Sequence, residues 1–117
     1  MLEMNAVNAP RPVPRWRSYD REVTTYVLIH GNWHDGSAWR GVAAALTARG
    51  HRSIAPTLPG RGEDPSKQTT YAACAQSVVD LITDEGLRDV VVVGHSGGAV
   101  VGSKVAQAIP DRIRWMT

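Results

Sequence analysis

From residue 23 to the end of the chain, short apolar runs alternate with longer segments whose apolar residues recur at helical spacing. The runs over residues 23–29 and 90–94 have the β-branched, apolar composition of buried strands. A short strand is expected over residues 52–55, and a last apolar stretch lies near residues 113–116. The segments with helical spacing span residues 37–49, 70–85 and 97–109. Alternating strands and helices predict an α/β fold, a parallel sheet of about four strands with flanking helices and right-handed crossovers.

Capping residues and turn residues set the boundaries of these elements. Gly50 is placed to end helix 37–49, while Thr69 or Thr70 caps helix 70–85 and Gly86 ends it. Residues 56–67 are rich in proline and glycine, so we expect a loop at the carboxyl edge of the sheet.

The first 22 residues have a different character. The apolar residues of this segment recur at neither strand nor helix spacing. Three prolines are interspersed with arginines in it: Pro10, Arg11, Pro12, Pro14, Arg15 and Arg17. Such composition is typical of a poorly ordered segment. We therefore expect a leader over residues 1–22 and one core domain over residues 23–117.

The apolar run 90–94 is followed at once by the sequence Gly94-His95-Ser96-Gly97-Gly98 and then by small residues that suit a helix. A serine at a sharp strand-to-helix turn has its hydroxyl exposed and its backbone strained, and flanking glycines let so tight a turn close because a side chain there would collide across it. The unpaired N–H groups of the following helix then point at whatever the serine attacks. Ser96 is the candidate nucleophile.

A second motif, His30-Gly31-Asn32-Trp33-His34, follows the apolar run 23–29. In acyl transfer, the developing oxyanion needs two preorganised donors, one from the residue after the nucleophile and one from the loop after a neighbouring strand. We assign these donors to the backbone N–H groups of Gly97 and Asn32.

The two motifs, their order and their spacing resemble the α/β-hydrolase fold, and within it the esterase and hydroxynitrile-lyase-like branch. The resemblance runs from about Val23 to the C-terminus and corresponds to the N-terminal portion of that fold. It implies a serine hydrolase whose triad follows the order Ser, acid, His. It also implies the spatial strand order 52–55, 23–29, 90–94, 113–116.

The loop after run 23–29 lies at the mouth of the site in such a fold, which places four residues at the substrate pocket: Gly31, Trp33, His34 and His95. His30 is expected to support the fold, and His95 to pack in the structure and not to act as a base. The chain departs from the family in two places. Thr57 stands where most members carry an aspartate. Gly97 stands where relatives often carry a bulky apolar residue, which predicts either a wider acyl pocket or a looser serine turn.

No residue of the chain matches the triad acid or base, which in the family follow later strands. The first hypothesis is therefore a hydrolase of carboxylic esters or amides that receives its acid and base from a C-terminal segment or a second chain. The alternatives are a non-catalytic remnant or partner subunit, and a cyanohydrin-cleaving lyase that needs a lysine downstream. Because the last strand would keep a bare edge, we expect self-association or a complementing C-terminal segment.

Composition narrows the function classes. The net charge of this 117-residue chain is +2 and its basic residues form no aromatic-interleaved face, which argues against nucleic acid and leaves a small-molecule substrate. The single cysteine, Cys74, forms no internal disulfide, so we expect a reducing, cytoplasmic setting. We expect neither a membrane span nor a metal or other cofactor, because the histidines do not group with carboxylates or thiolates at ligand spacing.

Overall fold

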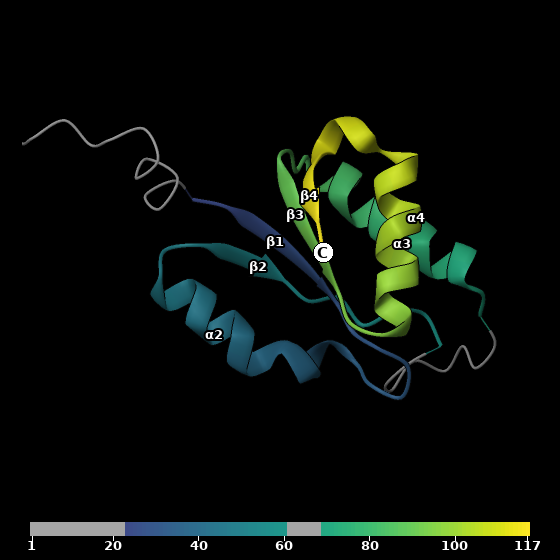
Figure 1. The fold of residues 1–117 in the computed structure, drawn as a ribbon, viewed down its shortest axis with the longest axis horizontal. Helices are drawn as coiled ribbons and strands as arrows, with labels where there is room; N and C mark the ends of the chain where they lie inside the picture. Colours follow the sequence, from purple (N-terminus) through teal and green to yellow (C-terminus); the bar gives the residue numbers. More distant parts are fainter. Residues whose placement is uncertain (1–22, 61–68) are drawn as a thin grey trace, which may run out of the picture.

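The computed structural model describes residues 23–60 and 69–117, in which four parallel strands form one sheet with helices on both faces (Figure 1). The strands are β1 (Thr25–Ile29), β2 (Arg52–Ile54), β3 (Val90–Gly94) and β4 (Ile113–Met116). The helices are the 3-10 turn η1 (Gly36–Trp39), α2 (Arg40–Ala48), α3 (Tyr71–Asp84), α4 (Gly97–Ala108) and the 3-10 turn η2 (Pro110–Arg112). The predicted leader lies outside the described residues.

The strand order is β2-β1-β3-β4 and every pair is parallel, so the predicted α/β class and strand order are confirmed. β1 and β3 pair over four residues, ending with Ile29 opposite Gly94. The pairing continues past the strand ends, where the N–H of His95 donates to the carbonyl of Ile29 at 3.0 Å. The two motifs found in the sequence therefore leave the sheet side by side.

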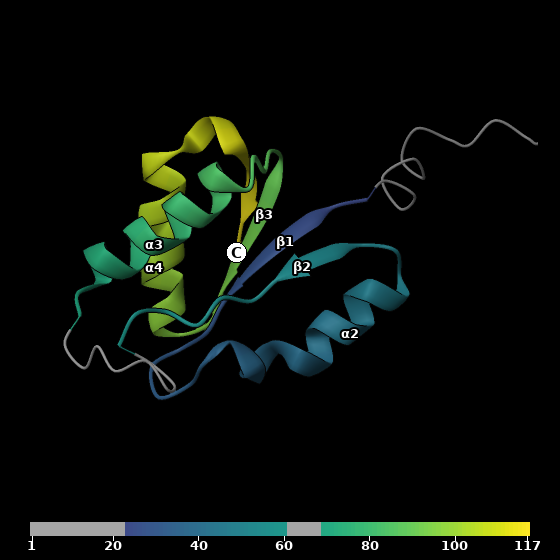
Figure 2. The same ribbon diagram turned by 180° about the vertical axis from the view of Figure 1, so that it is seen from behind.

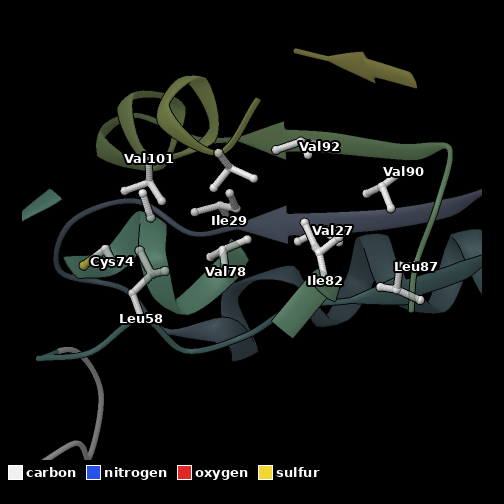
Figure 3. Close-up of a cluster of buried hydrophobic side chains, with 12 residues drawn as sticks. Val27, Ile29, Leu58, Cys74, Val78, Ile82, Leu87, Val90, Val92 and Val101 are labelled. Atoms are coloured by element: carbon white, nitrogen blue, oxygen red, sulfur yellow. The ribbon is translucent and has the colours of Figure 1, made fainter. Parts of the chain in front are cut away.

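Helices α3 and α4 cover one face of the sheet and α2 lies on the other (Figures 1 and 2). The buried apolar side chains lie between β1, β3, α3 and α4, together with Leu58 and Leu87 (Figure 3). Val27, Val78, Val90, Val92 and Val105 are fully buried there. This packing holds α4, and with it the turn that begins at the end of β3, against β1.

The predicted helix over residues 37–49 is divided in the structure. Its first turn is the 3-10 turn η1, because the Asp35 side chain caps it by accepting from the N–H of Ser37 at 2.8 Å, and the α-helix begins only at Arg40. α2 has no buried residue, and 46% of the Val42 surface is exposed. The apolar stripe predicted for this helix therefore covers the sheet only partly.

No helix in the described part of the chain is both long and apolar enough to cross a membrane.

Candidate active site

Ser96 forms the tip of the turn between β3 and α4. Its φ of 57° and ψ of −121° lie in a region that residues other than glycine rarely adopt, a strain of about 1–3 kcal/mol that the surrounding structure must hold. Two short bonds close the turn, from the N–H of Gly98 to the carbonyl of His95 and from the N–H of Ala99 to that of Ser96, both 2.9 Å. Ser96 is exposed at the N-terminus of α4.

Two glycines make the turn possible, for different reasons. A Cβ on Gly94 would stand 2.5 Å from the Gly98 carbonyl oxygen and 2.6 Å from Cα of Ala99, which is the predicted collision across the turn. A Cβ on Gly98 would overlap the carbonyl oxygen of Ile29 and stand 2.5 Å from that of His30. The obstacle at Gly98 is thus the end of β1, a neighbour that lies about 70 residues away in sequence.

The loop after β1 lies directly against this turn. A Cβ on Gly31 would stand 2.9 Å from Nδ1 of His95 and 3.2 Å from Cβ of Ser96, and a Cβ on Gly97 would stand 2.7 Å from Oδ1 of Asn32. Gly97 is the first residue of α4, a position where the N–H has no partner within the helix. The structure therefore brings the predicted nucleophile and both residues assigned to the oxyanion hole into one place.

A hollow of about 300 Å³ lies beside the turn. Its lining includes three of the four residues predicted for the substrate pocket, and it comprises His30, Gly31, His34, Ala38, Trp39, Val42 and His95. The rings of His34 and His95 lie with their centroids 6.1 Å apart and their planes tilted by 60°. His95, expected to be packed, is exposed at the edge of this hollow.

The structure does not bring the fourth residue, Trp33, to the hollow. Its φ of 71° turns the chain at this point, and 98% of its surface is exposed. Trp39, Ala38 and Val42 form the apolar wall instead. The last two were missed in the sequence, although their spacing along η1 and α2 puts them on one helical face.

Asp35 orients the segment that carries this wall. Its carboxylate accepts hydrogen bonds from the hydroxyl and from the backbone N–H of Ser37. These two bonds, the hydroxyl bond first, hold the pKa of the Asp35 carboxyl below its ordinary value. The carboxylate therefore stays ionised as the cap of η1.

His30 joins two loops at the carboxyl edge of the sheet. Its ring is 1% exposed, its Nε2 accepts from the N–H of Leu58 at 3.0 Å, and its Nδ1 lies 2.8 Å from the Gly31 carbonyl oxygen. Because Nε2 accepts, the ring proton is assigned to Nδ1, which donates to Gly31. This is the supporting role expected for His30.

Thr57 gives a second connection between the same loops. Its hydroxyl accepts from the N–H of Gly36 at 3.0 Å. The residue that replaces the family's usual aspartate therefore still holds the loop after β2 against η1.

Replacing His30 by alanine is expected to lower the free energy of unfolding by about 3 kcal/mol, because the buried N–H of Leu58 and the carbonyl of Gly31 each lose a partner. His51→Ala is the matched control, since Nδ1 of His51 also accepts a backbone N–H, that of Thr24, at a half-buried site. Its loss is expected to cost less than about 1.5 kcal/mol. Urea denaturation measures both, and equal costs would contradict the role given to His30.

Within residues 23–60 and 69–117, no hydrogen bond reaches the Ser96 hydroxyl, and no three His, Cys, Asp or Glu side chains group as metal ligands. In this part of the chain, the Ser96 hydroxyl therefore has no side-chain partner that could take its proton.

Comparison with known proteins gives matches over most of this region. A family model described as "Alpha/beta hydrolase family" matches residues 26–114. A carbendazim hydrolyzing esterase of Nocardioides sp. (strain SG-4G) is 39% identical over 95 residues, which cover 79% of this chain and 39% of that protein. Epoxide hydrolase 3 of Siraitia grosvenorii is 33% identical over 92 residues, 75% of this chain and 29% of that protein.

Solved structures agree with these matches. An extracellular alpha/beta-hydrolase from a Paenibacillus species superposes with a TM-score of 0.76 at 38% identity, over 80% of this chain and 38% of that one. Epoxide hydrolase VrEH1 from Vigna radiata superposes with a TM-score of 0.73 at 29% identity, over 81% of this chain and 32% of that one. The chain therefore spans well under half the length of the proteins it matches.

Proposed function

The chain belongs to the alpha/beta hydrolase family, and we propose that it carries the nucleophile and oxyanion hole of a serine hydrolase acting on carboxylic esters or amides. The observation that carries this proposal is the position of Ser96, exposed on a strained turn at a helix N-terminus and in contact range of the loop that contains Asn32. A strained, exposed serine in this position is the arrangement that nucleophilic attack requires.

In the proposed reaction, the Ser96 hydroxyl oxygen attacks the substrate carbonyl carbon while its proton passes to a general base. The carbonyl oxygen becomes an oxyanion that accepts hydrogen bonds from the N–H groups of Gly97 and Asn32. As this intermediate collapses, the base gives its proton to the departing alcohol or amine, and an acyl group remains on Ser96. The free base then takes a proton from water, which attacks the acyl carbon; the carboxylic acid leaves and the base returns the proton to the Ser96 oxygen.

The general base and its acid partner are proposed to come from outside the described residues. Support for this comes from the Ser96 hydroxyl, to which no side chain in the described part of the chain is hydrogen-bonded. The nearby rings of His34 and His95 both line the hollow, and we propose that they contact substrate there. Without a base, the oxyanion donors alone leave only a small part of the rate enhancement.

A fluorophosphonate probe tests this proposal, because it forms a covalent bond only with an activated serine. In the presence of the C-terminal segment or second chain that supplies the base, we expect one adduct in the intact mass of the chain, on the peptide that contains Ser96. Ser103→Ala is the matched control, since Ser103 is an exposed serine of the same helix whose hydroxyl donates to the Ala99 carbonyl, and its removal is expected to leave labelling unchanged. An unlabelled protein would instead favour a non-catalytic member of the family.

A further inference from the structure

The carboxamide of Asn32 occupies the space that a side chain at position 97 would need. A Cβ built on Gly97 would stand 2.7 Å from Oδ1, 2.9 Å from Cγ and 3.0 Å from Nδ2 of Asn32. All three distances are at or below the closest approach that real Cβ atoms show. Gly97 and Asn32 therefore fit each other as a pair, and any residue larger than glycine at position 97 must displace the carboxamide.

The same carboxamide is held from its other side by α3. Nδ2 of Asn32 donates to the hydroxyl of Tyr71, the first residue of that helix, at 3.3 Å. The start of α3 is itself fixed, because the Thr70 hydroxyl caps it by accepting from the N–H of Ala73 at 3.0 Å. Asn32 thus links the loop after β1 to two separate helices, α3 and α4.

The loop around Asn32 forms a surface turn. Trp33 and His34 are exposed, and the turn is closed by a bond of 3.3 Å from the N–H of His34 to the Gly31 carbonyl. An oxyanion donor, however, must stand within about 2.7–3.1 Å of the oxygen it stabilises. Small rotations of the peptide bond before Asn32 therefore change how well the Asn32 N–H can donate to the oxyanion.

We propose that the Asn32 carboxamide, seated against Gly97 and held by Tyr71, sets the position of the oxyanion donor, so that Tyr71 is a positioning residue and a larger residue at position 97 moves the carboxamide and with it the donor. This inference rests on the proposed function. It explains why the chain departs from the bulky residue that relatives often carry after the nucleophile. The space there is filled by a polar side chain from a neighbouring loop, and is not left open as a wider acyl pocket.

The first test is Tyr71→Phe, assayed with a p-nitrophenyl ester. The loss of one hydrogen bond is expected to lower kcat about threefold to tenfold while KM stays the same, because the donor acts on the transition state. The thermal midpoint should change little, since the bond is exposed. A Tyr71→Phe protein with the wild-type kcat would overturn the role of Tyr71.

The second test pairs Gly97→Ala with Asn32→Ala and measures the rate constant for fluorophosphonate labelling. Gly97→Ala alone is expected to slow labelling at least about tenfold. In the Asn32→Ala background, which keeps the N–H but removes the colliding carboxamide, the same change should have almost no effect. Gly98→Ala is the control for stability, because its Cβ meets backbone carbonyls that Asn32→Ala does not remove.

The outcomes separate the two proposals. If the wild-type protein is labelled but the effects of Gly97→Ala and Asn32→Ala multiply independently, the positioning inference fails and the proposed function stands. If the wild-type chain is not labelled in the presence of the segment or second chain that supplies the base, the proposed function fails. In that case, the free energies of unfolding of Gly97→Ala, Asn32→Ala and the double variant, measured by urea denaturation, still test the contact. Additive effects of the two substitutions would overturn the pairing of Gly97 with Asn32.

Discussion

Ser96→Ala is expected to lower p-nitrophenyl ester hydrolysis by the protein at least about 1000-fold, since the variant keeps the oxyanion donors but has no oxygen to form the acyl intermediate. Alanine keeps the positive φ of this position and its strain, so the free energy of unfolding should stay close to that of the wild type.

Ser103→Ala serves as the matched control for this assay and is expected to hydrolyse the ester at the wild-type rate. Ser96→Ala retaining more than about a tenth of the activity, with an unchanged circular dichroism spectrum, would contradict the role of Ser96. We set this threshold at a tenth of the activity because loss of a nucleophile lowers the rate by several powers of ten, whereas loss of a positioning contact lowers it by about one.

Gly98→Ala is expected to destabilise the protein by at least about 3 kcal/mol, because the new methyl group overlaps the carbonyl oxygens of Ile29 and His30. Neither oxygen lies on a side chain that can turn away. The strain must be relieved by separating α4 from the end of β1, and these two elements enclose the buried core. Urea denaturation followed by tryptophan fluorescence measures the loss.

Gly41→Ala is the matched control for this stability experiment. Gly41 lies in α2 with nothing within 4 Å of its added methyl group, so the change should raise the free energy of unfolding by about 0.5–1 kcal/mol through helix propensity alone. A Gly98→Ala protein as stable as the Gly41→Ala protein would show that the close approach of α4 to β1 is not required.

Strands and helix caps that are indicated by neighbouring residues were predicted with nearly the observed bounds. The strands over 90–94 and 113–116 have the bounds expected for them, and the cap at Thr70 is the expected one. The prediction for residues 37–49 was less accurate because Asp35 caps a 3-10 turn before the α-helix begins. The spacing of apolar residues does not distinguish a 3-10 turn from an α-helical turn where the two meet.

In the candidate site too, only the residues that lie in short sequence motifs could be singled out from the sequence. Ser96, Gly97 and Asn32 were found because a strand-turn-helix motif and a loop after a strand are both contiguous in sequence. Trp33 was assigned to the pocket from its position in that loop, but a residue's direction depends on its φ, here 71°. Tyr71 was missed because no neighbour in the sequence indicates its contact with Asn32, and Val42 was missed because helical spacing does not show that the hollow lies beside its face.

The amino-acid sequence by itself determined the alternation of strands and helices, the serine turn and the loop after β1, because each of these depends on residues within a few positions of one another. Only the tertiary structure decided that Gly98 faces β1, that Asn32 fills the space beside Gly97, and that Tyr71 reaches the same loop. Those contacts join residues about 40 to 70 positions apart. They exist only once the parallel register of β1 and β3 has set the distance between the two loops.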